Sequence, residues 1–364
     1  MSSIDEATQL DPADPVELTR QLCDIASVSG DEARIADAVE ALLRRSAPHL
    51  SIVRDGDTVI ARTESGRDRR VIIAGHLDTV PINDNLPVRD IAGADGEAMI
   101  WGRGTVDMKA GVAVQLALAV ELVSPSVDVT WVWYDHEEVE SSLNGLGRAL
   151  GRAPELFEGD FAILGEPSNG TIEGGCNSTL RARVTMLGRR AHSARSWMGV
   201  NAIHRAAAAL DRLAAYEARV VAVDGLEYRE GLNAVRIGGG VAGNVIPDRC
   251  DIEVNYRFAP SRSADEAVAF VREFFDDADE VEIVDLAPGA RPGLEAPLAR
   301  AFVAAVGTEP RAKVGWTDVS RFSALGIPAV NFGPGDPSLA HADDERVPVE
   351  QIVQTAAALR EWLS

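Results

Sequence analysis

Strand-like and helix-like segments alternate along the first half of the chain. Val71–Ala74 is a short apolar run typical of a buried strand, and residues 127–134 and 161–164 are two further runs of this kind. Residues 15–43 carry apolar side chains at helical spacing, and residues 109–123 are apolar enough to predict a buried helix. This alternation is typical of the α/β class, so we expect a domain with a mixed, largely parallel sheet.

The pattern changes after about residue 177. A strand, a helix, two strands, a helix and a final strand follow at residues 179–187, 202–216, 233–237, 251–258, 264–276 and 281–285. That order is typical of a small α+β domain of ferredoxin-like type, and the Pro-Gly pairs at 288–289 and 292–293 mark a hinge after it. We therefore expect the α/β domain to comprise residues 1–177 and 290–364, with the smaller domain inserted at 178–289.

Size, charge and cysteine content narrow the class of protein. A chain of 364 residues is long enough for two domains. The formal net charge of −22 has the wrong sign for binding nucleic acid or an anionic membrane. The acidic N-terminus lacks a signal region, and the three cysteines have neither metal-site nor disulfide spacing. We expect a cytoplasmic protein without a nucleic-acid or membrane partner.

Acidic and histidine side chains stand at the ends of the predicted elements. They are His76 and Asp78 after the strand at 71–74, Asp107 before the buried helix, Glu137 and Glu138 after the strand at 127–134, Glu166 after the strand at 161–164, and His341 in a late loop. In open α/β sheets, ligands bind beyond the carboxyl ends of the strands. Carboxylates gathered there would repel one another unless a cation compensated their charge. Such a set suits a pair of Zn²⁺ ions, and Asp107 could bridge them through its two oxygens.

Each of these side chains also has an ordinary structural interpretation. The ordinary roles are a strand cap for His76, a helix N-cap for Asp107, a solvated acidic loop for Glu137, Glu138 and Glu140, a turn residue for Glu166 and a surface residue for His341. The hypothesis of a metal site therefore depends on the joint presence of these residues in one order.

Five motifs together extend nearly from end to end of the chain. They are His76-Leu77-Asp78-Thr79-Val80, Gly102-Arg103-Gly104 with Asp107-Met108-Lys109, Glu137-Glu138, Gly165-Glu166-Pro167 and His341. In this order and spacing they resemble the M20 metallopeptidase family. The resemblance implies a metal-dependent amidohydrolase with two Zn²⁺ ions, for which Co²⁺ could substitute. One ion would be held by His76, Asp107 and Glu166, and the other by Asp107, Glu138 and His341.

The same resemblance implies roles for three neighbouring features. Glu137 would be the general base of the reaction. Asp78 would orient the imidazole of His76, in keeping with the general need to fix the tautomer of a histidine ligand. The peptide bond after Asp107 would be cis.

The inserted domain also carries motifs that resemble those of the family. Residues 188–195 resemble the lid-domain histidine motif, which implies a homodimer in which His192 stabilises the oxyanion of the neighbouring protomer. Without the family, His192 would be interpreted as a turn residue. The substrate-binding residues implied in this way are Arg195, Asn244, Arg257, Thr317 and Arg321. The arginines suit a substrate with carboxylates, because a guanidinium binds a carboxylate through two parallel hydrogen bonds.

The substrate prediction depends on finer features. Residues 191–204 are most similar to actinobacterial family members that remove succinate from N-succinyl-L,L-diaminopimelate, on the route to lysine and diaminopimelate. One departure is Gly175-Cys176-Asn177, where better-known enzymes of this kind carry two arginines after the glycine, so Arg195 or another residue would replace a contact. The alternatives are the deacetylation of acetylornithine or another aminoacylase or dipeptidase reaction. A non-catalytic metal-binding or ligand-binding protein of the same fold is an alternative of another class, which the presence of Glu137 disfavours.

Overall fold

The computed structural model describes residues 10–364, which form two compact units. Unit 1 comprises the described residues up to Gly174 together with Gly293–Arg311 and Arg321–Ser364, and unit 2 comprises Gly175–Pro292 and Ala312–Ser320.

The segment Ala312–Ser320 belongs to unit 2, although its place in the chain predicts the other domain. Within unit 2, the backbone N–H of Asn177 donates to the Lys313 carbonyl at 3.2 Å. The Ser320 hydroxyl donates to the Pro288 carbonyl at 2.6 Å. These contacts join residues far apart in sequence, so the order of elements along the chain gave no sign of them.

Unit 1 is built around an eight-stranded sheet with the strand order β1-β2-β6-β3-β7-β18-β8-β17. The strands are β1 (Ser51–Asp55), β2 (Thr58–Arg62), β3 (Arg70–His76), β6 (Asp128–Tyr134), β7 (Phe161–Leu164), β8 (Glu173–Gly174), β17 (Arg311–Ala312) and β18 (Ala329–Asn331). Strand β3 pairs in parallel with β6 and β7, and β7 with β18, whereas β1–β2, β2–β6 and β18–β8 are antiparallel. The parallel centre confirms the predicted fold class. Every residue of β6 is buried, as expected of an apolar strand covered on both faces.

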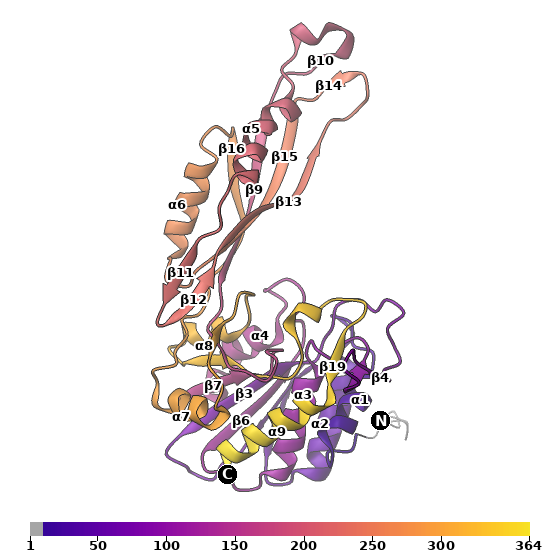
Figure 1. Ribbon diagram of the computed structural model, residues 1–364, viewed down its shortest axis with the longest axis vertical. Coiled ribbons are helices and arrows are strands. Elements are labelled where there is room, and N and C mark those ends of the chain that lie inside the picture. Colours follow the sequence, from indigo (N-terminus) through magenta and orange to yellow (C-terminus); the bar gives the residue numbers. More distant parts are fainter. Residues whose placement is uncertain (1–9) are drawn as a thin grey trace. The chain divides into compact units, whose positions relative to one another are not determined.

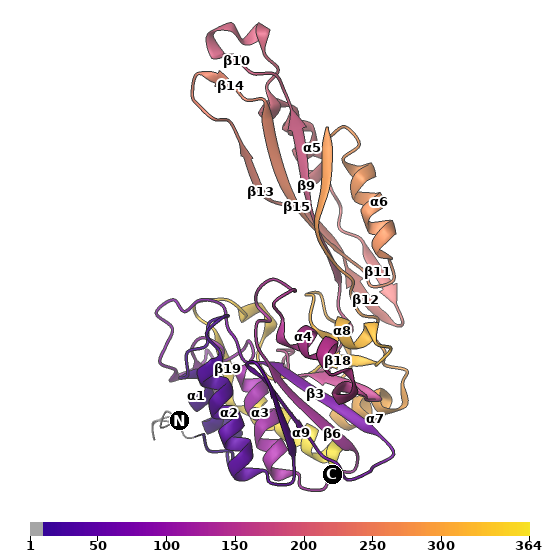
Figure 2. The same ribbon diagram turned by 180° about the vertical axis from the view of Figure 1, so that it is seen from behind.

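Helices pack against this sheet, and α1, α2, α3 and α9 lie together on one face of it (Figures 1 and 2). The helices of unit 1 are α1 (Pro15–Cys23), α2 (Ala33–Ser46), α3 (Lys109–Glu121), α4 (Gly145–Arg152), α7 (Pro297–Val306) and α9 (Val349–Leu363), with short 3₁₀ turns at Pro154–Phe157 and Pro337–Leu339. The short helix α8 (Val319–Ala324) begins in unit 2 and ends in unit 1. Residues 109–119 of α3 are all buried, which explains why this helix has no polar stripe. Among residues 10–364, no helix is both long and apolar enough to cross a membrane.

A small antiparallel sheet in unit 1 has the order β19-β5-β4. Its strands are β4 (Arg89–Ala92), β5 (Ala98–Trp101) and β19 (Arg346–Pro348). Arg346 of β19 lies opposite Trp101 of β5. The pairing brings the loop that follows His341 beside the segment that leads to Asp107, although these segments are far apart in sequence.

Unit 2 has the predicted βαββαβ order. Its elements are β9 (Ser178–Leu187), α5 (Ala202–Ala214), β13 (Gly231–Gly239), β15 (Arg249–Phe258), α6 (Ala264–Phe274) and β16 (Glu280–Ala287). The sheet order is β13-β15-β9-β16 and its pairs are antiparallel, which is the ferredoxin-like arrangement (Figure 1). Apolar side chains of both helices and all four strands form its core. Two short ladders add to it: β10 (Ala191–His192) with β14 (Val245–Ile246), and β11 (Val220–Val223) with β12 (Leu226–Arg229); a 3₁₀ turn covers Ser193–Met198.

Candidate metal centre

The ends of three parallel strands bring the candidate ligands of unit 1 together. Strand β3 ends at His76, β6 ends three residues before Glu137, and β7 ends two residues before Glu166. Because these strands run in parallel, their carboxyl ends lie at one edge of the sheet. Asp107 reaches the same edge from the segment before α3.

The carboxylate of Asp107 lies between two imidazoles. Its Oδ1 is 3.0 Å from Nε2 of His76, and its Oδ2 is 3.4 Å from Nε2 of His341. The same His341 nitrogen is 3.0 Å from Oε2 of Glu138. The two oxygens of Asp107 therefore face two different histidines, an arrangement that would suit a ligand shared by two ions.

The candidate ligands fall into groups in which one donor atom of each residue lies within 4.8 Å of the others. One group is His76, Asp107 and Glu166, and another is Asp107, Glu138 and His341. These are the two ligand sets that the family resemblance implies, and they share Asp107. A third group comprises His76, Glu137 and Glu138. Imidazole nitrogens with carboxylate oxygens are donors that suit Zn²⁺, so the residues present fit such an ion.

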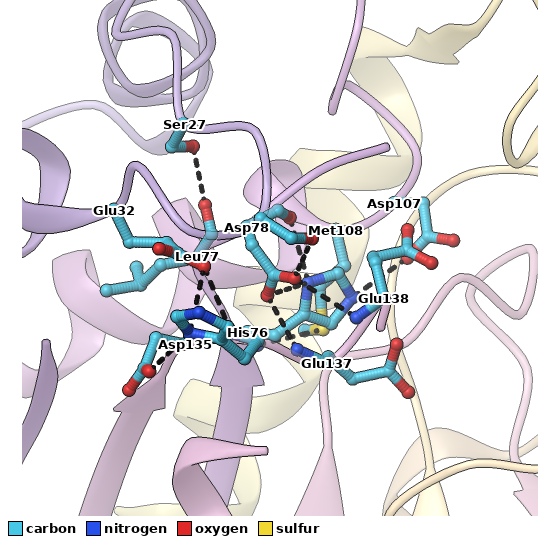
Figure 3. Close-up of polar contacts among 12 residues, drawn as sticks. Ser27, Glu32, His76, Leu77, Asp78, Asp107, Met108, Asp135, Glu137 and Glu138 are labelled. Carbon is cyan, nitrogen blue, oxygen red and sulfur yellow. Dashed lines mark hydrogen bonds and ion pairs between the residues drawn. The ribbon is translucent and has the colours of Figure 1, made fainter. Parts of the chain in front are cut away.

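Asp78 contacts both His76 and the turn that carries Glu137 and Glu138. Nδ1 of His76 is 3.0 Å from the Asp78 carbonyl and 3.4 Å from its Oδ1. The backbone N–H groups of Glu137 and Glu138 donate to the two oxygens of the same carboxylate, each at 3.0 Å (Figure 3). Asp78 therefore turns Nε2 of His76 toward Asp107 and fixes the turn that carries the two glutamates.

The neighbouring carboxylates raise the pKa of both imidazoles. Hydrogen bonds with Asp107 and Glu138 raise the pKa of His341 to about 10. Burial lowers the pKa of His76, but hydrogen bonds with Asp107 and Asp78 outweigh it and raise the pKa well above its usual value. Burial raises the pKa of Asp78, but the contacts with His76, Ser29 and the backbone of Glu137 together lower it to about 2. A histidine ligand must be neutral, so a cation would compete with protons for these nitrogens and bind more weakly as the pH falls.

The candidate residues of unit 2 lie at different places within it. His192, in β10, is exposed, and its Nδ1 accepts the Ala194 N–H at 3.1 Å. Its neighbours are Arg195 in the adjoining 3₁₀ turn and Asn244, whose carbonyl accepts the Ser193 N–H at 2.9 Å. These three residues are therefore brought together.

The remaining substrate candidates stand apart from that group. Arg257 lies in β15, with its Nε donating to Asn255 at 3.1 Å. The Thr317 carbonyl lies 3.7 Å from the Cys176 thiol in the same unit. Arg321 belongs to unit 1, where its guanidinium donates to the Ser141 hydroxyl at 3.0 Å, in the loop that follows Glu138.

Three buried or half-buried residues that the sequence did not single out contact the centre. The Ser29 hydroxyl donates to Asp78 at 2.7 Å. Glu32 accepts the His136 N–H at 3.2 Å, next to Glu137 (Figure 3). Glu345 accepts backbone N–H groups beside Asp107. Their types are common in turns and acidic loops, so only long-range contacts identify them.

The peptide bond between Asp107 and Met108 is cis, as the family resemblance implied.

Comparison with known proteins gives close relatives of nearly the same length. A Mycobacterium tuberculosis protein, provisionally named succinyl-diaminopimelate desuccinylase, is 55% identical over 351 residues, covering 96% of this chain and 98% of its own. The succinyl-diaminopimelate desuccinylase of Corynebacterium glutamicum is 49% identical over 360 residues, which cover 96% of each chain.

Solved structures share the fold. A tripeptidase from Staphylococcus aureus superimposes with a TM-score of 0.77 at 22% identity and covers 98% of both chains. An M20 family metallo-carboxypeptidase from Sulfolobus solfataricus gives a TM-score of 0.74 at 15% identity, over 99% of this chain and 98% of its own. The family model described as peptidase family M20/M25/M40 matches residues 72–364. The chain belongs to this family, as its motifs predicted.

Proposed function

We propose that the chain is a metal-dependent amidohydrolase that converts N-succinyl-L,L-diaminopimelate to succinate and L,L-diaminopimelate. The observation that carries the chemistry is the pair of ligand clusters that share Asp107. The names of the relatives at 55% and 49% identity support the choice of substrate. The enzyme would thus act in the biosynthesis of lysine and diaminopimelate.

In this proposal the ligand residues hold the ions, and Glu137 moves a proton. His76, Asp107 and Glu166 would hold one Zn²⁺, and Asp107, Glu138 and His341 the other; Co²⁺ could replace them. Such ions supply a water molecule of lowered pKa and polarise the amide carbonyl. Glu137 takes a proton from the attacking water and delivers it to the departing amine as the C–N bond breaks. The water oxygen remains on the succinyl carbon, so succinate and a free amine result.

The position of Glu137 depends on Asp78. Because Asp78 accepts the N–H groups of Glu137 and Glu138, it fixes the base beside a ligand. One carboxylate thereby orients His76 and sets the backbone of the base.

A homodimer with His192 acting between subunits completes the proposal. In it, His192 of the partner subunit donates to the oxyanion that forms on the amide carbon. Exposed apolar side chains near His192 support association of unit 2, since Trp197 is 76% exposed and Met198 is 56% exposed. We place the enzyme in the cytoplasm, where its three buried, free cysteines would stay reduced.

The succinyl carboxylate requires a cationic partner, for which we propose Arg195, Arg257 or Arg321, with Asn244 and Thr317 as polar neighbours. Cys176 and Asn177, where the sequence departs from the expected pair of arginines, are both buried. The Asn177 amide donates to the Arg229 carbonyl at 2.9 Å, so its side chain supports the fold of unit 2. We therefore propose that another residue binds the succinyl group.

A direct comparison of two substrates tests the proposed function. The Zn²⁺-loaded protein is expected to show a kcat/KM about 10–100-fold higher for N-succinyl-L,L-diaminopimelate than for N-acetylornithine. The reason is that a charge-assisted hydrogen bond to a carboxylate, absent from the acetyl group, contributes about 1.5–3 kcal/mol. A preference for N-acetylornithine would make the chain a deacetylase. Hydrolysis of neither compound would point to another aminoacylase or dipeptidase reaction, or to a non-catalytic role.

A further inference from the structure

We propose that Glu345 is a positioning residue. It holds the loop that carries His341 (residues 340–345) against the loop that carries Asp107 (residues 102–108). The inference rests on the proposed metal centre and concerns how the second ligand set, Asp107 with Glu138 and His341, keeps its shape.

Glu345 is a buried acid with contacts on both oxygens. Its side chain is 0% exposed. Oε1 accepts the backbone N–H of Val106 at 2.8 Å and that of Asp107 at 3.0 Å. Oε2 accepts a hydrogen bond from Nη1 of Arg103 at 2.8 Å. One carboxylate from the His341 loop therefore fixes the backbone at the bridging ligand.

Arg103 makes the connection in the opposite direction. The same Nη1 donates to the Ala342 carbonyl, next to His341, at 3.2 Å. The backbone N–H of Gly102 donates to the Glu345 carbonyl at 2.9 Å. Each loop thus contributes one buried charged side chain that binds the other loop. Because burial makes an unpaired charge costly, the pair Arg103–Glu345 favours a single register of the two loops.

The loop that carries His341 depends on the Arg103–Glu345 pair for its position. His341 is 55% exposed at its side chain, and its backbone has φ of +65°, which histidine adopts uncommonly. Its neighbours Asp343 and Asp344 are exposed as well. Packing therefore contributes little to the position of His341, whereas Glu345, four residues later, is fully buried. We infer that the imidazole stays 3.4 Å from Asp107 because the Arg103–Glu345 pair anchors its backbone.

Glu345→Gln tests the inference by measuring ion binding instead of turnover. The amide keeps the size of the side chain but replaces one acceptor oxygen with a donor that faces Arg103. In a competitive titration of the metal-free protein with Zn²⁺ against a chromophoric chelator, the affinity of the site formed by Asp107, Glu138 and His341 should fall about tenfold, as for other residues that orient ligands. The absorption spectrum of Co²⁺ at that site should change too.

The control and the outcomes separate this inference from the metal centre itself. Asp344→Asn removes one negative charge from the same loop at a side chain that is 66% exposed, and it should bind Zn²⁺ as wild type does. If wild type takes up fewer than two ions, the metal centre is wrong. If wild type takes up two and Glu345→Gln binds both equally well, only the positioning role is wrong.

Circular dichroism would show whether Glu345→Gln folds. If it does not fold, a second variant tests the same inference. Arg103→Lys keeps the positive charge but replaces the guanidinium with one ammonium, which cannot reproduce its fork geometry. It should weaken the same site in the same direction. Unchanged affinity for both ions in a folded Arg103→Lys protein would overturn the inference.

Discussion

Replacement of Glu137 by Gln is expected to lower kcat roughly 10²–10⁴-fold without loss of bound Zn²⁺, because an amide cannot accept the proton of the attacking water. The backbone N–H of Glu137 still reaches Asp78, so the turn should keep its shape. Steady-state kinetics with metal analysis of the same sample measures both quantities.

Glu137 could be the general base or a metal ligand, because it also belongs to a possible ligand group with His76 and Glu138. The metal content of the Glu137→Gln protein decides between these two roles. Loss of one ion in the Glu137→Gln protein would show that Glu137 is a ligand. Near-normal turnover of this variant would show that Glu137 is not the base. Glu140→Gln is the matched control, because Glu140 is exposed in the same loop. Its kinetics should equal those of wild type.

Replacement of His192 by Ala is expected to lower kcat roughly 10²–10³-fold, the usual loss for one oxyanion donor. Because His192 is exposed, the change should leave thermal stability nearly unaltered. His204→Ala provides the control, since His204 is an exposed histidine in the same unit.

Mixing His192→Ala with Glu137→Gln tests whether the histidine acts across the dimer. A mixed dimer would contain one complete site, with Glu137 from one chain and His192 from the other. If subunits exchange freely, half of the dimers are mixed, so about a quarter of all sites should regain activity. Absence of recovery, with exchange shown by differently tagged chains, would place His192 in its own subunit or outside catalysis.

Much of the fold follows from local pattern. The apolar runs of β3, β6 and β7 and the change of pattern near residue 177 predict the two architectures that the structure contains. The hairpin β11–β12 was missed, although Asp224-Gly225 at its turn is a strong hairpin signal. The short strands β4, β5 and β19 have too few residues to show a period. Their pairing depends on tertiary contacts, as does the assignment of residues 312–320 to unit 2.

Some residues of the candidate site could likewise be predicted from the sequence, and others could not. His76, Asp107 and His341 could be identified because ligand types at the ends of elements match the chemistry of a metal. Ser29 and Glu345 could not, because they act through hydrogen bonds to segments far away in sequence. Glu345 also follows the exposed Asp343 and Asp344, from which nothing in the sequence distinguishes it.

Anomalous diffraction at the zinc edge from crystals of the Zn²⁺-loaded protein tests the central claim most directly. We predict two peaks in unit 1, each about 2.0–2.2 Å from its ligand atoms. One should be bound by His76, Asp107 and Glu166, and the other by Asp107, Glu138 and His341. A single peak, or two peaks that do not share Asp107, would contradict the account.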